Sequence, residues 1–358
     1  MKPSSLCLSL FATQALAYPG MKATIAEIQA RSNSALSRRS TELLGDLKTT
    51  DDSDLTTSGS TIKAILDGSS SALADSTTYT PPGELTSDEC KNSTICVWYH
   101  IAQDLESSFT DDSGCTALAR GAIRLGFHDA ATWDKNSDYG GADGSIALND
   151  DEAARSENRG LDTIIPQTKT WFDTYKGYGI SMADLIQTAA MTASVVCPLG
   201  PRIKHYVGRK DDSTAGPTGK LPLPQQDAQF IIDLFAAKTF TSDDLVALLG
   251  AHSVSKQRFV DPSRSGASQD STPAVWDLNY YGETIAGDNE TILIFHSDAS
   301  IASYSTTKDR FKAFSADGAG PAWNAAYAPA YFRMSMLGVN NLNDLTEITQ
   351  VLPLFRNA

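Results

Sequence analysis

The sequence predicts a mainly α-helical fold, and two features of the chain after Cys90 lead to that prediction. Apolar residues recur there at helical spacing, as in Val97-Ile101-Leu105 and Met182-Leu185-Ile186-Ala189. Runs that alternate between apolar and polar residues, which are typical of strands, are scarce. The chain has 358 residues, which is long enough for a sizeable buried core in one large domain or two smaller ones.

Three further segments carry the helical spacing: Ile123-Phe127, Phe230-Ile231-Leu234-Phe235 and Leu245-Leu248-Leu249. Thr241-Ser-Asp-Asp precedes the last of these and resembles a helix start. Long stretches rich in Gly, Asp, Ser and Pro lie between the helical segments, at 132–145 and 260–275. Loops of this length inside a compact helical domain are usually functional, for example in metal binding.

The composition excludes several classes of protein. Lys and Arg total 29 against 43 Asp and Glu, which gives a net charge of -14. A chain this acidic is a poor candidate for binding nucleic acid or anionic lipid, because both need a positive surface. No apolar run reaches the roughly 18 residues that a membrane span needs.

The N-terminus has the pattern of a secretory signal peptide over residues 1–17. Lys2 supplies positive charge, a short apolar run follows, and Ala15-Leu16-Ala17 fits the small residues of a cleavage site. Secretion removes Cys7 and exposes the chain to an oxidising compartment. The even number of remaining cysteines then predicts two disulfides among Cys90, Cys96, Cys115 and Cys197. The glycosylation sequons at Asn92 and Asn289 agree with secretion.

Residues 18–86 are rich in Ser, Thr, Asp and Ala, and we interpret them as a propeptide or flexible extension. Arg38-Arg39 is a dibasic pair that could serve as a processing site, and Lys48 to Ser60 has the composition of a disordered segment. The alternative is a helical cap on the main domain.

Residues 120–130, RGAIRLGFHDA, carry the first chemical signal. On a helix, Arg124 and His128 share a face because they are four residues apart, and Phe127 lies beside them. A neutral His128 can move a proton between the two oxygens of a peroxide, and Arg124 can stabilise the negative charge that develops. Taken alone, this spacing is more typical of a surface helix with salt bridges.

Oxygen-bearing residues follow directly. Asp129, the Gly141 carbonyl, Asp143 and Ser145 offer closely spaced hard ligands that suit calcium, although a Gly/Asp turn of this kind often holds nothing. Asn158 comes later and could accept a hydrogen bond from one ring nitrogen of His128, which would leave the other nitrogen free as a base.

These motifs together resemble the plant-type haem peroxidase superfamily, in particular the secreted fungal branch (class II) related to lignin and manganese peroxidases. The resemblance rests on RLGFHDAATW, GGADGSIAL and the later Asn158 in the first half, and on DLVALLGAHSVSK, Asp270 to Asp277 and His296-Ser-Asp298 in the second. It spans roughly residues 88–340, about 70% of the chain.

The resemblance implies a haem b held between a distal helical half (about 88–220) and a proximal half (about 221–345). We therefore expect a haem peroxidase domain over 87–345 and a C-terminal tail over 346–358. His252 would be the axial iron ligand, and Asp298 would accept a hydrogen bond from its far ring nitrogen. Two calcium ions are implied. The first is the distal site above, and the second has the ligands Ser253, Asp270, Thr272, Val275 (carbonyl) and Asp277.

The family pattern also implies smaller features. Cys115 and Cys197 match a pair that is bridged in the fungal branch, which leaves Cys90 and Cys96 to form the other disulfide. Pro222 lies in a Pro-containing segment similar to one that lines the haem edge, although an ordinary loop is an equal alternative. Gln269 is a departure, because the family usually places an aromatic residue there against the haem.

Other departures concern the electron donor. Manganese peroxidases carry carboxylates where this chain has Ala117, Gly121 and Arg258, so ligands for Mn(II) are missing. Lignin peroxidases expose a tryptophan where this chain has Ala247. Trp98, Trp133, Trp171, Trp276 and Trp323 could include another radical site, but core packing is the commoner role for a tryptophan.

We therefore predict a secreted, extracellular haem-dependent peroxidase that reduces hydrogen peroxide and oxidises phenolic or other small organic donors in one-electron steps. We expect a monomer that binds neither nucleic acid nor membrane. The alternative is a catalytically silent, calcium-stabilised secreted binding protein on the same scaffold. A hydrolase that uses His128-Asp129 and a metal is disfavoured, because no second His or Cys ligand is nearby. The physiological donor, the redox potential and the fate of 18–86 do not follow from the sequence.

Overall fold

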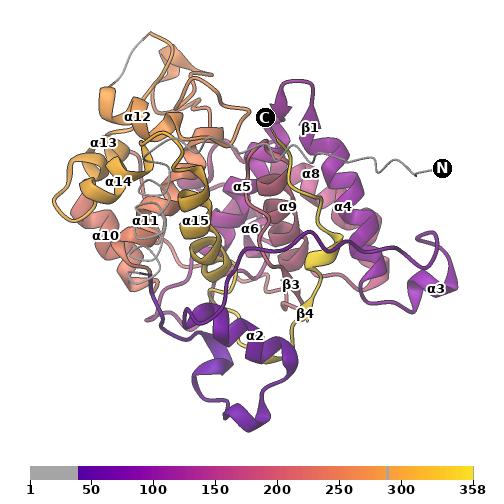
Figure 1. Cartoon of the computed structure of the whole chain (residues 1–358). Coiled ribbons are helices and arrows are strands. Elements are labelled where there is room, and N and C mark those ends of the chain that lie inside the picture. The colour runs from indigo at the N-terminus through magenta and orange to yellow at the C-terminus, as the bar shows by residue number, and fades with distance from the viewer. Residues whose placement is uncertain (1–38, 288–289, 358) are drawn as a thin grey trace, which may run out of the picture.

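The computed structural model describes residues 39–287 and 290–357 (Figure 1). The signal peptide predicted for residues 1–17, Arg38 and the sequon at Asn289 lie outside the described residues. The fold is mainly α-helical, as the sequence predicts. Its α-helices are α2 (Thr57–Leu66), α3 (Asp88–Lys91), α4 (Cys96–Phe109), α5 (Ala117–Ala130), α6 (Ser145–Leu148), α7 (Asp150–Ala153), α8 (Ile164–Tyr175), α9 (Met182–Val196), α10 (Ala228–Ala237), α11 (Ser242–Leu249), α12 (Asn279–Ala286), α13 (His296–Ser303), α14 (Lys308–Phe314) and α15 (Gly320–Met334).

Strands are few and short in the described part of the chain. β1 (Thr110–Asp111) pairs antiparallel with β2 (Gly114–Cys115), and β3 (Tyr206–Val207) pairs antiparallel with β4 (Thr346–Glu347). The first pair is a local hairpin between α4 and α5, whereas the second joins the middle of the chain to its end. Helices therefore build the core, and the strands only fasten loops.

Helix α9 is the central helix of the distal half, and all of its residues are buried. It begins after Ser181, whose side chain accepts a hydrogen bond from the backbone N–H of Asp184. It contacts α4, α5 and α8. A Cβ atom at Gly126 of α5 would lie 2.6 Å from the Cβ of Ala190, so only glycine lets α5 pack this closely on α9.

No single helix among residues 39–287 and 290–357 has the length and apolar composition to cross a membrane. Ile164–Tyr178 and Met182–Val196 satisfy those two criteria only when they are joined across a bend of 120°. Helix α9, the second member of that pair, is instead a buried core helix.

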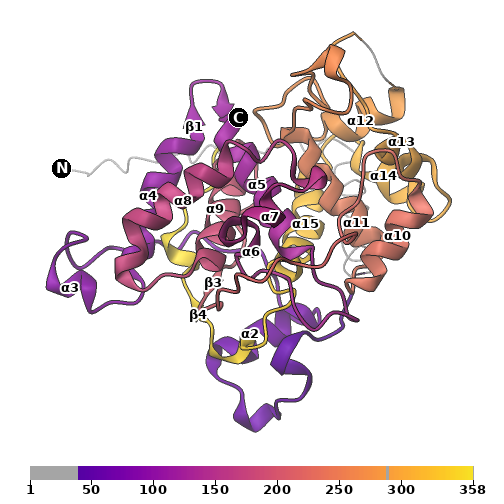
Figure 2. The same cartoon turned by 180° about the vertical axis from the view of Figure 1, so that it is seen from behind.

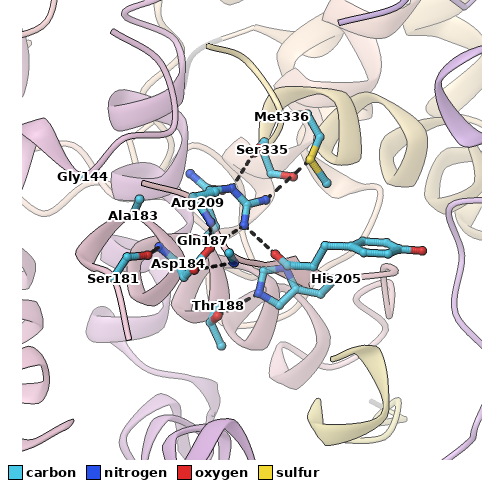
Figure 3. Close-up of polar contacts among 12 residues, drawn as sticks. Gly144, Ser181, Ala183, Asp184, Gln187, Thr188, His205, Arg209, Ser335 and Met336 are labelled. Atoms are coloured by element: carbon cyan, nitrogen blue, oxygen red, sulfur yellow. Dashed lines mark hydrogen bonds and ion pairs between the residues drawn. The ribbon is translucent and has the colours of Figure 1, made fainter. Parts of the chain in front are cut away.

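A buried ion pair anchors the start of α9, as Figure 3 shows. Asp184 and Arg209 lie 2.9 Å apart, and their side chains are 4% and 0% exposed. The guanidinium of Arg209 also donates to the carbonyl oxygens of Tyr206 and Ser335. The second oxygen of Asp184 accepts from the backbone N–H of Gly208 at 2.7 Å. The pair therefore ties α9 to the strand β3 and to the end of α15.

The remaining helices form a second half. Figures 1 and 2 show α10 to α14 gathered on one side of the molecule and α4, α5, α8 and α9 on the other, with α15 between them in both views. Helix α15 contacts α11 and α14. Helix α11 starts at the predicted Thr241, where a capping box joins the Thr241 and Asp244 side chains to each other's backbone N–H.

Residues 39–86 differ from the flexible extension expected of them. The short 3₁₀ helix Gly45–Lys48 and helix α2 bury five apolar side chains to 2% exposure or less: Leu44, Leu47, Ile62, Ile65 and Leu66. The buried guanidinium of Arg333 donates to the carbonyl oxygens of Ser40, Glu42 and Leu66. The described part of this segment is thus a helical cap, because a few spaced Leu and Ile residues give it a buried face despite its polar average composition.

The segment expected to be a C-terminal tail, 346–358, is also joined to the domain. After β4, Val351 and Leu352 are buried. The buried guanidinium of Arg202 donates to the carbonyl oxygens of Thr349, Leu352 and Pro353. Since Arg202 lies in the distal half, the chain end helps to close that half.

Both disulfides pair as the family resemblance implied. Cys115, in β2, is bonded to Cys197 at the end of α9, and Cys90 is bonded to Cys96 across the junction between α3 and α4. The first bond links segments 82 residues apart in the sequence. It therefore fixes the hairpin that precedes α5 onto the central helix.

The ion pair of α9 predicts a large effect of one substitution. Asp184→Asn leaves the Arg209 charge buried without a partner, and we expect it to lower the free energy of unfolding by about 3–5 kcal/mol. Denaturant unfolding followed by far-UV circular dichroism measures this value. Asp150→Asn is the control, because the Asp150 carboxylate pairs with Lys169 but is 91% exposed, and solvent screens such a pair so that its loss should change stability little. Equal effects of the two variants would contradict the prediction.

Candidate active site

Helix α5 brings Arg124 and His128 together as their spacing predicts. The helix starts at Thr116, whose side chain accepts from the backbone N–H of Ala119. Arg124 Nε donates to His128 Nε2 at 3.2 Å, and the guanidinium also donates to the carbonyl oxygens of Arg159 at 2.7 Å and Glu157 at 3.2 Å. Burial lowers the pKa of Arg124 to about 10, so the side chain keeps its positive charge at neutral pH.

His128 is 7% exposed and is held by Asn158 from the 3₁₀ turn Ser156–Asn158. Its Nδ1 lies 2.8 Å from Asn158 Oδ1, and Asn158 Nδ2 donates to the Glu152 carbonyl at 2.8 Å. An amide oxygen can only accept, so the proton of the ring lies on Nδ1 and the lone pair on Nε2. Burial and the nearby Arg124 charge lower the pKa of His128 to about 3, which keeps the ring neutral.

Phe127 extends this site toward the other half. Its ring meets the His128 ring edge to face at 5.5 Å and stacks on Phe235 of α10 at 6.2 Å. A second contact joins the halves, because Arg159 lies 5.9 Å from the ring centre of Phe259, seven residues after His252. The loops around the distal histidine and the segment after His252 therefore meet.

His252 lies in the 3₁₀ turn Gly250–Val254 that follows α11. Its Nδ1 lies 2.9 Å from Asp298 Oδ2, near the start of α13. The ring is flanked by Tyr280 at 5.7 Å and Phe295 at 5.8 Å. The carboxylate of Asp298 accepts, so a proton on Nδ1 points toward it, and in the neutral ring the lone pair then lies on Nε2.

The donor set around His252 fits an iron porphyrin. Within residues 39–287 and 290–357, His252 Nε2 has no hydrogen-bond partner, and the side chain is 32% exposed although Asp298 behind it is buried. One neutral imidazole, oriented by a buried carboxylate, is the arrangement that haem peroxidases use on the proximal side. The residues present therefore match the group that the family implies.

The predicted distal oxygen ligands lie together. Asp129 and Ser145 are fully buried, and Asp129 Oδ1 and Ser145 Oγ have no hydrogen-bond partner in the described structure. Gly141 has a φ of 113°, and a Cβ there would lie 2.3 Å from the Leu337 carbonyl, so only glycine fits. Burial, followed by the Asp143 charge, raises the pKa of Asp129 well above its ordinary value, and burial raises the pKa of Asp143 to about 6.

The predicted proximal ligands show the same pattern. Ser253 and Asp270 are fully buried, and Ser253 Oγ and Asp270 Oδ2 have no hydrogen-bond partner among the described residues. Thr272 Oγ1 donates to Asp277 Oδ2 at 2.7 Å, while the Val275 carbonyl accepts from the Asp277 N–H at 3.1 Å. Burial and the Asp277 charge raise the pKa of Asp270 to about 8.

The unpaired oxygens in both clusters fit a cation. A buried acceptor without a partner costs free energy, and two carboxylates that repel each other add to that cost. A divalent ion that prefers oxygen would remove both penalties. The described residues also contain the close group Cys90, Cys96 and His100, but both cysteines are in a disulfide and offer no thiolate.

The sequence reasoning did not assign Glu152 or Glu283 to these clusters, and it did not foresee the contact of Gln269 behind His252. Glu152 Oε1 is buried without a partner near Asp129, and Glu283 adds a carboxylate beside Asp270 and Asp277. Gln269 was read only as a missing aromatic residue, yet its Nε2 lies 3.0 Å from Asp298 Oδ2. Acidic residues just after each loop were the available signal for the first two. No signal in the sequence pointed to the contact between Gln269 and Asp298.

The residues that bear on the choice of electron donor differ in their exposure to solvent. Ala247 is buried at 1% exposure, whereas Ala117 and Arg258 are exposed. Four of the five tryptophans are buried, and Trp133 alone is partly exposed. Pro222 is half-buried, and its segment is joined to the proximal side where the Ser297 N–H donates to the Pro224 carbonyl at 2.9 Å.

Comparisons with known proteins agree with this geometry. A profile of the family described as Peroxidase matches residues 101–317. The chain is 31% identical to a peroxidase of Arthromyces ramosus, and the match covers 76% of this chain and 79% of that protein. A peroxidase of Coprinopsis cinerea gives the same values. Ligninase C of Trametes versicolor is 31% identical, over 74% of this chain and 76% of the relative.

The family profile matches 217 residues of the chain. This match agrees with the pairing of Arg124 with His128 and of His252 with Asp298. The chain belongs to the peroxidase family, among the plant-type haem peroxidases related to the fungal class II enzymes, and it is a haem-dependent peroxidase.

Proposed function

We propose that the chain is a secreted peroxidase that binds haem b at His252, reduces hydrogen peroxide and oxidises small phenolic donors. One observation carries the proposal: a neutral His128 has its proton fixed on Nδ1 by Asn158 and its Nε2 directed at Arg124. An unprotonated imidazole nitrogen beside a fixed positive charge is what proton transfer within a bound peroxide requires.

Haem bound at His252 would supply the electrons and an open iron position for peroxide. His128 Nε2 would take the proton from the inner oxygen of the peroxide and return it to the outer oxygen, which leaves as water. Arg124 is anchored by two backbone carbonyls and would stabilise the charge on the departing oxygen. Asn158 keeps the His128 proton on Nδ1, so that Nε2 stays the base.

On the other side, Asp298 would hold His252 by its Nδ1–H and give the imidazole anionic character. Tyr280 and Phe295 pack on the ring and restrict its rotation. Pro222 would contribute to the haem edge, since its segment contacts the start of α13 through Ser297. Phe127 would cover the distal pocket.

Calcium would occupy two sites. The distal ligands would be Asp129, Gly141, Asp143 and Ser145, next to His128 in the sequence. The proximal ligands would be Ser253, Asp270, Thr272, Val275 and Asp277, and Ser253 directly follows His252. Each ion would therefore stabilise the backbone that positions one of the two histidines.

Secretion is supported by the two disulfides, which form and persist in oxidising compartments. Asn92 of the first sequon is exposed and available to a glycan. A signal peptide over 1–17, an extracellular location, a monomeric state and the boundaries of the 87–345 domain remain part of the proposal. Removal of residues beyond the signal peptide stays a prediction.

The role of His128 predicts a kinetic effect. His128→Ala should slow the reaction with peroxide by roughly 10²–10⁴-fold, because it removes the proton-transfer group, while the Soret band of bound haem persists. Stopped-flow absorption after mixing with peroxide measures the rate. His296→Ala is the control, because that histidine is 60% exposed and pairs with Asp227 outside the site. A near-wild-type rate in His128→Ala would refute the assignment, and absence of any Soret band in the wild type would favour a silent binding protein.

The oxygen clusters predict a pH-dependent response to calcium. In the metal-free protein the pKa of Asp270 is about 8, against about 3.9 in an unfolded chain. The stability that its neutral form contributes is complete below about pH 4 and is lost as the pH rises through about 8. Calcium needs the deprotonated ligand, so the rise in Tm on adding calcium should grow from pH 5 to pH 8.

Differential scanning calorimetry with and without a chelator tests this response. Asp270→Asn should reduce it, whereas Asp112→Asn, at an exposed aspartate, should not. Chelation should also change the spectrum of the iron and lower activity, because Ser253 adjoins His252. An unchanged Tm and spectrum after verified metal loss would mean that these clusters hold no structural calcium.

The donor prediction follows from the missing ligands. Mn(II) prefers carboxylate and water ligands, and Ala117 and Gly121 supply none while the exposed Arg258 would repel the ion. We expect turnover of small phenols and Mn(II) oxidation no faster than in a haem-free control. A steady-state panel of Mn(II), a phenol and a bulky non-phenolic aromatic tests both. Saturable Mn(II) turnover would refute the prediction.

Efficient oxidation of the bulky donor would implicate a surface aromatic, and Trp133→Phe is the first variant to make because Trp133 is the partly exposed tryptophan.

A further inference from the structure

Gln269 lies behind the proximal histidine, in a position fixed by the backbone. Gln269 is buried, with 1% of its surface exposed. Its N–H donates to the Ser255 carbonyl at 3.3 Å, and the neighbouring Ser268 forms bridges with Lys256 and Ile292. The segment that carries Gln269 is therefore paired with the segment that directly follows His252.

The side-chain amide of Gln269 shares an acceptor with His252. Gln269 Nε2 lies 3.0 Å from Asp298 Oδ2, and His252 Nδ1 lies 2.9 Å from the same oxygen. The two nitrogens are 3.2 Å apart. Both carry protons and neither can accept from the other, so their closeness results from a common acceptor. Turning the amide over would place Oε1 against the carboxylate, which is electrostatically unfavourable.

The side-chain oxygen of Gln269 makes no contact that would explain a glutamine here, so the Nε2 contact with Asp298 is the effect of this residue. Gln269 Oε1 is buried and has no hydrogen-bond partner among the described residues. An unpaired buried acceptor is costly, and an apolar side chain of the same size would avoid that cost. Asp298 Oδ1 has a longer contact with Ser297 Oγ at 3.3 Å, so Oδ2 is the oxygen that serves both nitrogen donors.

We propose that Gln269 is a positioning residue that weakens the hydrogen bond from the His252 Nδ1–H to Asp298. The weaker hydrogen bond raises the reduction potential of the haem iron. A carboxylate oxygen that accepts from two donors polarises each of them less than it would polarise one alone. His252 then has less anionic character and stabilises the ferric iron less. This inference rests on the proposed role of His252 as the iron ligand.

The test compares holoenzymes by two measurements other than activity: the ferric/ferrous midpoint potential and the iron–histidine stretching frequency from resonance Raman spectra of the ferrous protein. Gln269→Met keeps the size and removes the donor. We expect a lower midpoint potential and a higher stretching frequency. Loss of one competing hydrogen bond should change the redox equilibrium constant by about threefold to tenfold, which is about 30–60 mV at 59 mV per tenfold.

Gln257→Met is the matched control. Gln257 is also a buried glutamine on the proximal side, at 4% exposure, but its side chain bonds to the backbone of Asp261 and Arg264 and not to Asp298. It should leave both measurements unchanged. In an Asp298→Asn background, Gln269→Met should lose most of its effect, because the shift acts through the carboxylate. Gln269→Leu replaces Gln269→Met if the latter does not fold.

The outcomes separate this inference from the proposed function. Unchanged potential and frequency in Gln269→Met would overturn it, as would equal shifts in Gln257→Met or a full shift in the Asp298→Asn background. His252→Ala tests the underlying assignment independently, and we expect it to abolish the iron–histidine band. Retention of that band in His252→Ala would refute His252 as the ligand, and the role of Gln269 would fall with it.

Discussion

The ion pair between Asp184 and Arg209 is the constraint on which the catalytic half depends. Two charges with side-chain exposures of 4% and 0% are tolerated only because each is paired and hydrogen-bonded. The pair fixes the start of α9, the fully buried helix on which α5 packs. Because Arg124 and His128 lie on α5, the placement of the proposed site depends on an interaction that touches neither of them.

The two histidines of the site are held in the same way but by different partners. Each gives its Nδ1–H to a buried oxygen and keeps the Nε2 lone pair, but His128 faces an amide and His252 faces a carboxylate. A neutral partner leaves the ring a weak base that can release the proton it takes. An anionic partner increases the electron density on the ring, which suits a metal ligand. The choice between Asn158 and Asp298 thus separates the two roles that we propose.

Buried oxygens without partners recur next to both histidines. Asp129 directly follows His128 and Ser253 directly follows His252, and each has an oxygen that the described residues leave unpaired. In a metal-free protein these oxygens destabilise the backbone that carries the histidines. The proposed cations would therefore be coupled to the positions of the two histidines through adjacent residues. Glu152 strengthens the link on the distal side, because its carbonyl also holds Asn158.

Much of the fold and of the site could be predicted from the sequence, because local rules govern it. Helical periodicity located α4, α5, α9, α10 and α11, the capping residues located the start of α11, and a four-residue spacing placed Arg124 beside His128. The disulfide pairing and the role of Asp298 came only from family resemblance, and the residue type of Asn158 raised its contact with His128 only as one option. Their partners lie 30 and 46 residues away, and spacing along a chain says nothing about such distances.

Tertiary structure alone decided the rest. Residues 39–86 have a polar average composition, yet a few of their Leu and Ile side chains are buried against the domain. Two buried arginines, Arg202 and Arg333, also donate hydrogen bonds to backbone carbonyls of this segment. Gln269 departs from the family at a position where only the folded chain shows a second donor on Asp298. Composition and periodicity describe a segment by itself, whereas burial and the direction of a side-chain amide depend on which distant segments pack against it. The sequence by itself therefore determined the helices and the chemistry of the distal face, and packing determined what those groups contact.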